Sequence, residues 1–150
     1  MENLEVFVLR GKIIESVHKA KCLVKDSKLR VLFSTNHDDN YIFPRSSIKI
    51  FQALPLIISE AHTKFNLNQE KLAIACSSHI GEKRHLRIVN DWISKLGLKN
   101  SILKCGIHLP IDGKSSQNLL LQGKLPTELH NNCSGKHLGM VSGCIANKFS

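Results

Sequence analysis

The spacing of apolar residues along the chain changes near Pro44. Before it, the segments Val6–Leu9, Ile13–Val24 and Leu29–Ser34 are rich in β-branched and other apolar side chains, and a turn at Asp26 precedes the last of them. This pattern predicts a small antiparallel β unit. After Pro44, apolar residues recur every three or four positions, as on one face of a helix. Strands followed by helices predict an α+β fold.

The second part of the chain carries several helical patterns. Pro44 and Ser46 suit the start of a first helix, and Pro55 is expected to kink or split that helix after its second turn. Further on, the expected elements are a short apolar helix or strand over Glu70–Cys76, an amphipathic helix over Arg84–Leu96 that stops at Gly97, a loop over Lys104–Gly113, a brief helix over Gln117–Leu121 and a helix over Gly135–Asn147.

Length and composition are typical of one domain. The chain has 150 residues, of which 42% are hydrophobic, enough for a core. No apolar run approaches the roughly 18 residues that span a membrane. The first residues include Glu2 and no basic region, which argues against a secretory signal and favours a cytoplasmic protein. In that setting the odd number of cysteines predicts free thiols. The five are Cys22, Cys76, Cys105, Cys133 and Cys144.

The formal net charge of +9 raises the question of an anionic partner. The basic residues are spread along the chain, and the densest group, Lys83, Arg84 and Arg87, falls at one predicted helix. Only 5% of residues are aromatic, too few for surfaces on which bases stack. The sequence therefore predicts no nucleic-acid partner.

The first candidate for chemistry is the Ser-x-x-Lys pair Ser46 and Lys49. Side chains three apart at a helix start share a face. A neutral lysine amine can accept the proton of a serine hydroxyl and so produce a nucleophile. The alternative interpretation is that Ser46 is a helix cap and Lys49 a solvated surface residue. A single Ser-x-x-Lys pair, taken alone, favours the cap.

A second candidate is the serine-rich segment from Ser77 to Glu82, which includes Ser78 and His79. It follows an apolar run and precedes a helix, a common location for functional loops. Adjacent side chains seldom point at each other, so Ser78 and His79 are a weak nucleophile and base pair. The competing interpretation makes Ser78 or Gly81 the cap of the next helix, with Glu82 in its first turn.

The third candidate is the segment LHNNCSGKHLGM, residues 129–140, which concentrates polar side chains of the kind used in sites. By spacing alone, Cys105, His108, Cys133 and His137 form one possible Cys2His2 zinc site, although the spacing matches neither a zinc finger nor a ribbon. The alternative is that Cys105 is a buried thiol and His108 a loop residue.

Four segments taken in order resemble a known family. They are PRSSIKIFQALPLI, LAIACSSHIGEKRH, LKCGIHLP and ELHNNCSGKHLGMVSGC. Together they resemble the bacterial and fungal L-asparaginase II family of the Rhizobium type, over most of the chain up to Cys144. The resemblance implies part of a fold like that of serine β-lactamases and glutaminases, an antiparallel sheet packed with helices. It also implies hydrolysis of L-asparagine to aspartate and ammonia.

The resemblance also assigns catalytic roles. It implies that Ser46 is the nucleophile and Lys49 its base. Ser78 matches a second active-site serine, which works in the family with a lysine from the C-terminal half.

Pocket and metal roles follow from the same resemblance. Arg45 and His137 fall at positions that line the substrate pocket. Cys133 and Lys136 match two ligands of a zinc ion whose further cysteine ligand comes later in the family. Cys105 and His108 are then loop residues.

Family members are more than twice as long as this chain, and the resemblance ends after Cys144. Residues 1–150 are therefore expected to form the N-terminal portion of a single domain, without the later zinc cysteine and the lysine partner of Ser78. The missing strands would leave apolar faces and strand edges exposed. We expect a truncated or split product that is inactive alone, and either a homodimer or a complementing C-terminal chain as partner. The rival expectation is a non-catalytic remnant or binding module.

Overall fold

The computed structural model describes residues 4–35, 41 and 43–149. Contacts between Cα atoms divide the chain into two units, Met1–Phe43 and Pro44–Ser150. Strands lie in the first unit and helices in the second, so the fold is mixed α+β, as the sequence predicts. The closer likeness to serine β-lactamases stays a prediction.

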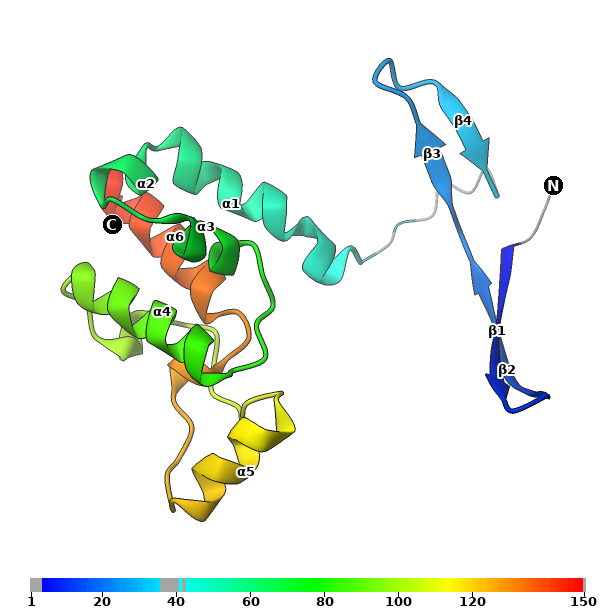
Figure 1. The fold of residues 1–150 in the computed structure, drawn as a ribbon. Helices are drawn as coiled ribbons and strands as arrows, with labels where there is room; N and C mark the ends of the chain where they lie inside the picture. Colours follow the sequence, from blue (N-terminus) through cyan, green and yellow to red (C-terminus); the bar gives the residue numbers. More distant parts are fainter. Residues whose placement is uncertain (1–3, 36–40, 42, 150) are drawn as a thin grey trace. The chain divides into compact units, whose positions relative to one another are not determined.

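The first unit consists of two antiparallel ribbons of two strands (Figure 1). Strand β1 (Leu4–Arg10) pairs with β2 (Ile13–Ala20), and β3 (Leu23–Lys25) pairs with β4 (Val31–Ser34). The predicted antiparallel β unit is therefore confirmed. The expected strand over 13–24 is divided between the two ribbons, because the chain leaves β2 at Ala20 and starts β3 at Leu23.

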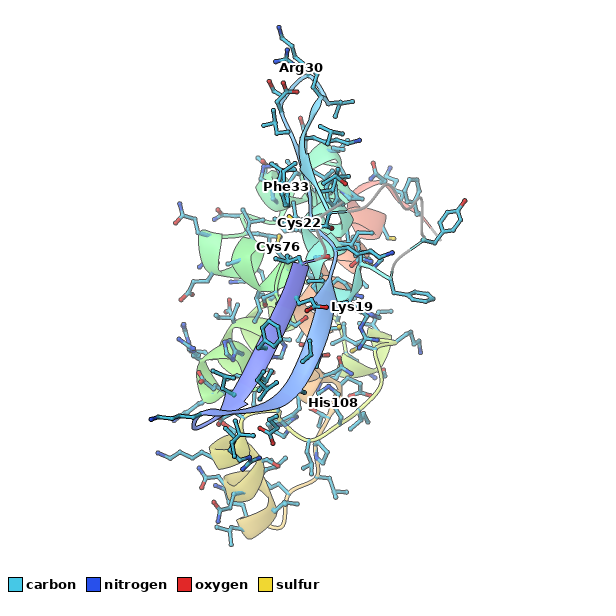
Figure 2. All side chains as sticks on the ribbon, turned by 90° about the vertical axis from the view of Figure 1, so that its right-hand side faces the viewer. Lys19, Cys22, Arg30, Phe33, Cys76 and His108 are labelled. Atoms are coloured by element: carbon cyan, nitrogen blue, oxygen red, sulfur yellow. The ribbon has the colours of Figure 1, made fainter. Side chains whose placement is uncertain are left out.

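The strands of these ribbons carry exposed apolar side chains. Phe7 and Val8 are adjacent on β1, point to opposite faces of the ribbon, and are 50% and 42% exposed. Figure 2 shows Phe33 on β4 and Arg30 at the turn between β3 and β4, where Arg30 forms an ion pair with Asp26. Two-stranded ribbons without a packed face are marginally stable in water. Turn chemistry and pairing, with little burial, hold this unit together.

The second unit is helical, with its core around α6 (Ser134–Ala146). This helix packs against α1, α2, α3 and α4. The core contains fully buried Leu138 of α6 and Trp92 of α4, whose indole N–H donates to the hydroxyl of Ser142. The other elements are η1 (Arg45–Ile48), α1 (Lys49–Ile58), α2 (Ala61–Lys64), α3 (Gln69–Ala75), α4 (Lys83–Lys95), η2 (Asn100–Ile102), α5 (Gly113–Leu121) and η3 (Glu128–His130), where η marks a 3-10 helix.

Glycines let α6 approach its neighbours closely. Gly135, Gly139 and Gly143 are four residues apart and share one face of the helix. A Cβ atom on Gly135 would lie 2.6 Å from the backbone oxygen of Ile74 in α3, closer than a packed carbon and oxygen can come. The start of α6 is thereby held directly against the end of α3, which leads into the loop at 77–82.

The expected split of the first helix at Pro55 is wrong. Helix α1 continues through Pro55 to Ile58. Proline removes one intrahelical hydrogen bond, normally made to the carbonyl of the residue four positions earlier, here Phe51. Phe51 is 67% exposed. The lost bond does not end the helix, and the next residue, buried Leu56, keeps it packed on the core.

Helix boundaries elsewhere follow the sequence with local differences. Helices α4 and α6 agree with their predicted ranges within one or two residues, and Gly97 adopts the positive φ of a helix stop. Helix α5 begins at Gly113, earlier than expected, because the Asp112 side chain accepts from the backbone N–H of Ser115 and caps it. The described residues contain no helix long and apolar enough to cross a membrane.

Candidate active site

Three predicted catalytic side chains lie together in the second unit. The hydroxyl of Ser46 lies 2.9 Å from the hydroxyl of Ser78, and either can donate. The Nζ atom of Lys49 donates to the Ser78 hydroxyl over 2.6 Å. The backbone N–H of Lys49 donates to the carbonyl of Ser46, but among the described side chains no hydrogen bond joins the Ser46 hydroxyl to the Lys49 amine. The connection therefore runs from Ser46 through Ser78 to Lys49.

Lys49 is the first residue of α1 and is only 4% exposed. Its Nζ atom donates to the backbone carbonyl of Ser77 over 2.6 Å as well as to Ser78. A third contact, at 3.5 Å, reaches the sulfur of Cys133. A buried amine needs such partners, since an unpaired one would be costly. The interpretation of Lys49 as a solvated surface residue is therefore wrong.

Ser46 is not a helix cap. It lies inside η1, whose N-cap residue is Pro44, and its hydroxyl faces Ser78. The preceding residue, Arg45, has a φ of 51°. Residues other than glycine rarely adopt this left-handed backbone conformation. Arg45 is exposed, and its side chain makes no hydrogen bond or ion pair with the described residues. Its predicted role in lining the pocket stays a prediction.

A buried hydrogen-bond network fixes the loop that carries Ser78. His79, 3% exposed, has its Nε2 atom 2.7 Å from the hydroxyl of Ser134, which itself donates to the carbonyl of Leu129. The Nδ1 atom accepts from the backbone N–H of Gly81. The donors and acceptors of this network are all satisfied if His79 is neutral and carries its proton on Nε2, which then donates to the hydroxyl of Ser134. The network ties the Ser78 loop to the start of α6.

Burial and nearby positive charges keep His79 neutral. Burial, then the positive charges of His85 and Lys49, lower the pKa of His79 from 6.5 to about 4. The rings of His79 and His85 are stacked, with centroids 5.3 Å apart. His79 bonds to Ser134 and Gly81 and not to Ser78, in agreement with the expectation that adjacent side chains seldom point at each other.

The predicted cap of α4 is corrected by the structure. Neither Ser78 nor Gly81 occupies the N-cap position, which belongs to Glu82; the Glu82 and His85 side chains each bond to the other's backbone N–H. Gly81 serves a different purpose, because its φ is 81° and a Cβ there would lie 2.9 Å from the Cβ of Pro110. The loop therefore passes tightly beside the segment around Pro110.

The polar segment at 129–140 forms η3, a turn and the start of α6. Asn131 holds it in place: its side-chain amide donates to the carbonyl of Cys105 over 2.7 Å, and its side-chain oxygen accepts from the backbone N–H of Cys133 over 2.8 Å. Cys133 is the N-cap residue of α6. This arrangement brings its sulfur to Lys49.

His137 lies one turn further along α6 and is half-buried. Burial, followed by the charges of Lys136 and Lys49, lowers the pKa of His137 below its usual range. Its contact with a substrate stays a prediction.

The structure does not support the four-ligand zinc site. Cys105, His108, Cys133 and His137 all belong to the described residues, which contain no group of three or more His, Cys, Asp or Glu side chains placed to hold a metal. Both ring nitrogens of His108 are occupied, one by the Leu109 carbonyl and one by the backbone N–H of Asn132.

The two zinc ligands implied by the family resemblance are too few to hold a zinc ion. Cys133 and Lys136 offer one thiol and one amine, whereas structural zinc sites use four ligands and catalytic sites three with water. In addition, the sulfur of Cys133 already faces the amine of Lys49. The described residues do not fit a zinc ion by themselves, and the mechanism proposed for the site uses none.

A cavity lies away from these side chains. It measures about 690 Å³ and is lined by α5, the segment at 124–130 and the first turn of α4. None of Ser46, Lys49 and Ser78 lines it. Its lining includes the Thr127 hydroxyl, 3.1 Å from Nδ1 of His130, but that ring nitrogen also accepts from the backbone N–H of Thr127 in the cap of η3. The polar cluster around Lys49 is therefore the better candidate for chemistry.

A mixed α+β fold with a serine and lysine cluster on a helix start is typical of hydrolases that use a serine hydroxyl. The comparison with protein families agrees. The L-asparaginase II family matches residues 6–150, so the chain belongs to the L-asparaginase II family of hydrolases. A search of curated proteins finds no match. The Rhizobium type within the family stays a prediction.

Sequence reasoning missed three parts of the site. The carbonyl of Ser77 accepts from Lys49, and backbone acceptors leave no residue-type signal. The contact between His79 and Ser134 spans 55 positions and joins two segments that were considered separately. Asn131 belongs to the polar segment, but the sequence did not indicate that its side chain joins the backbone of Cys105 to that of Cys133.

Proposed function

We propose that the chain carries the serine and lysine centre of an L-asparaginase, with Ser46 as nucleophile. Membership of the L-asparaginase II family supplies the substrate, L-asparagine. The observation that carries the mechanism is the unbroken hydrogen-bonded path from Ser46 through Ser78 to Lys49. Ser46 is exposed and can meet a substrate, whereas Lys49 is buried.

In this mechanism Ser46 attacks the carbon of the side-chain carboxamide. Its proton moves to the Ser78 oxygen while the Ser78 proton moves to the amine of Lys49, which must be neutral to accept it. Lys49 then gives this proton back through Ser78 to the amide nitrogen, the C–N bond of the tetrahedral intermediate breaks, and ammonia leaves while Lys49 becomes neutral again. Water then hydrolyses the acyl-serine ester and restores the Ser46 hydroxyl. Arg45 and His137 are proposed to contact the substrate.

A covalent probe tests the nucleophile without requiring turnover. A fluorophosphonate should modify Ser46 in the full chain, located by peptide mass spectrometry. General-base assistance is typically worth 10²–10⁴-fold, so Lys49→Met should slow labelling by about 100-fold. Exposed Ser101 is the matched control, and Ser101→Ala should change nothing. Labelling of Ser78 in place of Ser46, or equal labelling of Ser101, would contradict the assignment.

Ammonia release from L-asparagine tests the reaction itself. We expect no turnover by the chain alone, and activity when a polypeptide with the remaining strands is added. Ser46→Ala should abolish that activity. Full activity of the complemented Ser46→Ala variant would show that the nucleophile is wrong.

A second candidate function is a non-catalytic module that binds a complementing chain. The observation that favours it is the exposed apolar side chains of the β ribbons, together with exposed apolar residues on α1 such as Ile50 and Phe51. Covalent labelling of Ser46 separates the two candidates, because a non-catalytic remnant has no reason to activate that hydroxyl.

A further inference from the structure

The contact between the amine of Lys49 and the sulfur of Cys133 is not used by the proposed mechanism. Lys49 is the first residue of α1, and Cys133, the N-cap residue of α6, lies 84 positions later in the chain. The two atoms lie 3.5 Å apart. We propose that Lys49 and Cys133 form a covalent, reversible S–N bridge when the protein meets a hydroperoxide oxidant.

The surroundings of the two groups favour this pairing. Cys133 is a free thiol and partly exposed, so a small peroxide can reach it. Lys49 is buried and anchored by the Ser77 carbonyl and the Ser78 hydroxyl, so its amine stays beside the sulfur. Asn131 fixes the backbone N–H of Cys133. Neither side chain needs to cross the molecule for the bond to form.

The chemistry takes two steps and one equivalent of hydrogen peroxide. First, the thiol sulfur attacks one peroxide oxygen, and the O–O bond breaks to give a sulfenic acid and water. The sulfur is then electrophilic, as in the condensation of sulfenic acids with nitrogen nucleophiles. The lone pair of the Lys49 amine forms an S–N bond, the S–O bond breaks, and a second water leaves. Starting from the ammonium form, one proton passes to solvent.

The bridge would have a functional consequence that rests on the proposed function. It consumes the amine that accepts the serine proton, so the bridged chain would lack its base until a thiol reductant cleaves the S–N bond. Formation of the bridge itself depends only on the geometry of Lys49 and Cys133. The bridge can thus be tested whether or not the chain hydrolyses asparagine.

Peptide mass spectrometry of the full chain tests the proposal. After treatment with hydrogen peroxide under non-reducing conditions, we expect linked peptides containing Lys49 and Cys133. Their mass should equal the sum of the two peptides less two hydrogen atoms, and dithiothreitol should restore the separate peptides. Cys133→Ser should abolish the species. Cys76→Ser should leave it unchanged, since Cys76 is an exposed free thiol outside the pair.

Cys105 is the main competitor, because the side chain of Asn131 bonds to the backbone of both Cys105 and Cys133 and so holds the two residues close together. Cys105→Ser removes the competing disulfide and should preserve the bridge. The proposal is overturned if this variant, with an unchanged circular dichroism spectrum, yields only sulfinic or sulfonic Cys133 with free Lys49. A linked pair that retains an added oxygen would exclude the direct S–N bond.

Discussion

The imidazole of His79 and the hydroxyl of Ser134 lie 2.7 Å apart, fully buried between the loop after α3 and the first turn of α6. Each is the chain neighbour of a site residue, Ser78 in one case and Cys133 in the other. The pair therefore determines the separation of the two segments that surround the amine of Lys49. Several consequences of this arrangement can be measured.

Removal of the Ser134 hydroxyl should destabilise the second unit. Ser134→Ala leaves the Nε2–H of His79 without an acceptor in a buried place, which costs about 1–3 kcal/mol. Urea unfolding followed by tryptophan fluorescence reports it, because Trp92 lies in the same core. The matched control is exposed Ser101→Ala, expected within about 0.5 kcal/mol of the parent. Equal effects of both changes would show that the buried pair is unimportant.

Acid should weaken the fold through His79. Its pKa is about 4 in the folded chain, against the ordinary value of 6.5 for an exposed histidine, so between these values only the unfolded chain takes up the proton. The free energy of unfolding should be highest above pH 6.5 and fall as the pH drops towards 4. Urea titrations at several pH values measure the slope.

The matched comparison for this pH dependence is His79→Gln. His85, His130 and His137 also have lowered pKa values, each mainly through burial, so the slope should become shallower without disappearing. An unchanged slope in His79→Gln would show that His79 is not protonated on unfolding in this range.

The glycine at the start of α6 should tolerate no side chain. In Gly135→Ala the new Cβ would meet the Ile74 carbonyl at 2.6 Å, and a backbone atom cannot move aside cheaply. Overpacking of this kind typically costs about 1–3 kcal/mol or more. Gly113→Ala in α5 is the control, since its Cβ would meet nothing within 4 Å. Thermal unfolding of the two variants should differ clearly, and similar midpoints would contradict the close packing.

The ion pair between Lys71 and Asp91 should stabilise the fold more than the exposed ion pair between Arg87 and Glu70. Lys71 is 6% exposed, and its amine would lose its partner in Asp91→Asn, at a cost of about 1–3 kcal/mol. Arg87 and Glu70 are both largely exposed, so Glu70→Gln should cost under about 1 kcal/mol. Urea midpoints compare the two, and a larger loss in Glu70→Gln would be inconsistent with the burial of Lys71.

Zinc binding by the isolated chain should be weak. Cys133 and Lys136 provide two donors where zinc needs three or four protein or water ligands in a fixed geometry. Metal analysis after dialysis should give clearly less than one zinc per chain, with no change in thermal midpoint on adding a chelator. A tight one-to-one complex would require ligands that the described residues do not place together.

The sequence predicted much of this structure because its signals were local. The β-rich segments at 6–9, 13–24 and 29–34 indicated antiparallel strands, and the amphipathic pattern of α4 with Gly97 after it indicated a helix and its end. Ser46 and Lys49 were singled out by a three-residue spacing, which any helical turn converts into proximity. Ser78 joined them through the family resemblance, and the structure places it between the two.

What the sequence missed depends on contacts between distant segments. Pro55 was expected to kink or split α1, but the helix continues to Ile58, with Leu56 buried in the core. Spacing alone allowed His108 as a zinc ligand, but its ring nitrogens bond to the backbone, in agreement with the loop role that the family resemblance implies. The neighbours of Lys49 include a carbonyl from Ser77 and a thiol from Cys133, and a one-dimensional pattern does not reveal that these meet.

The exposed β ribbons have a calorimetric consequence. The heat capacity change of unfolding scales with the apolar surface that is newly hydrated. Phe7, Val8 and their neighbours already face water in the folded chain, so loss of the strands hydrates little more. The excess heat capacity peak of the whole chain should therefore come almost entirely from unfolding of the helical unit. Unfolding of the ribbons should give no separate peak in the calorimetric scan.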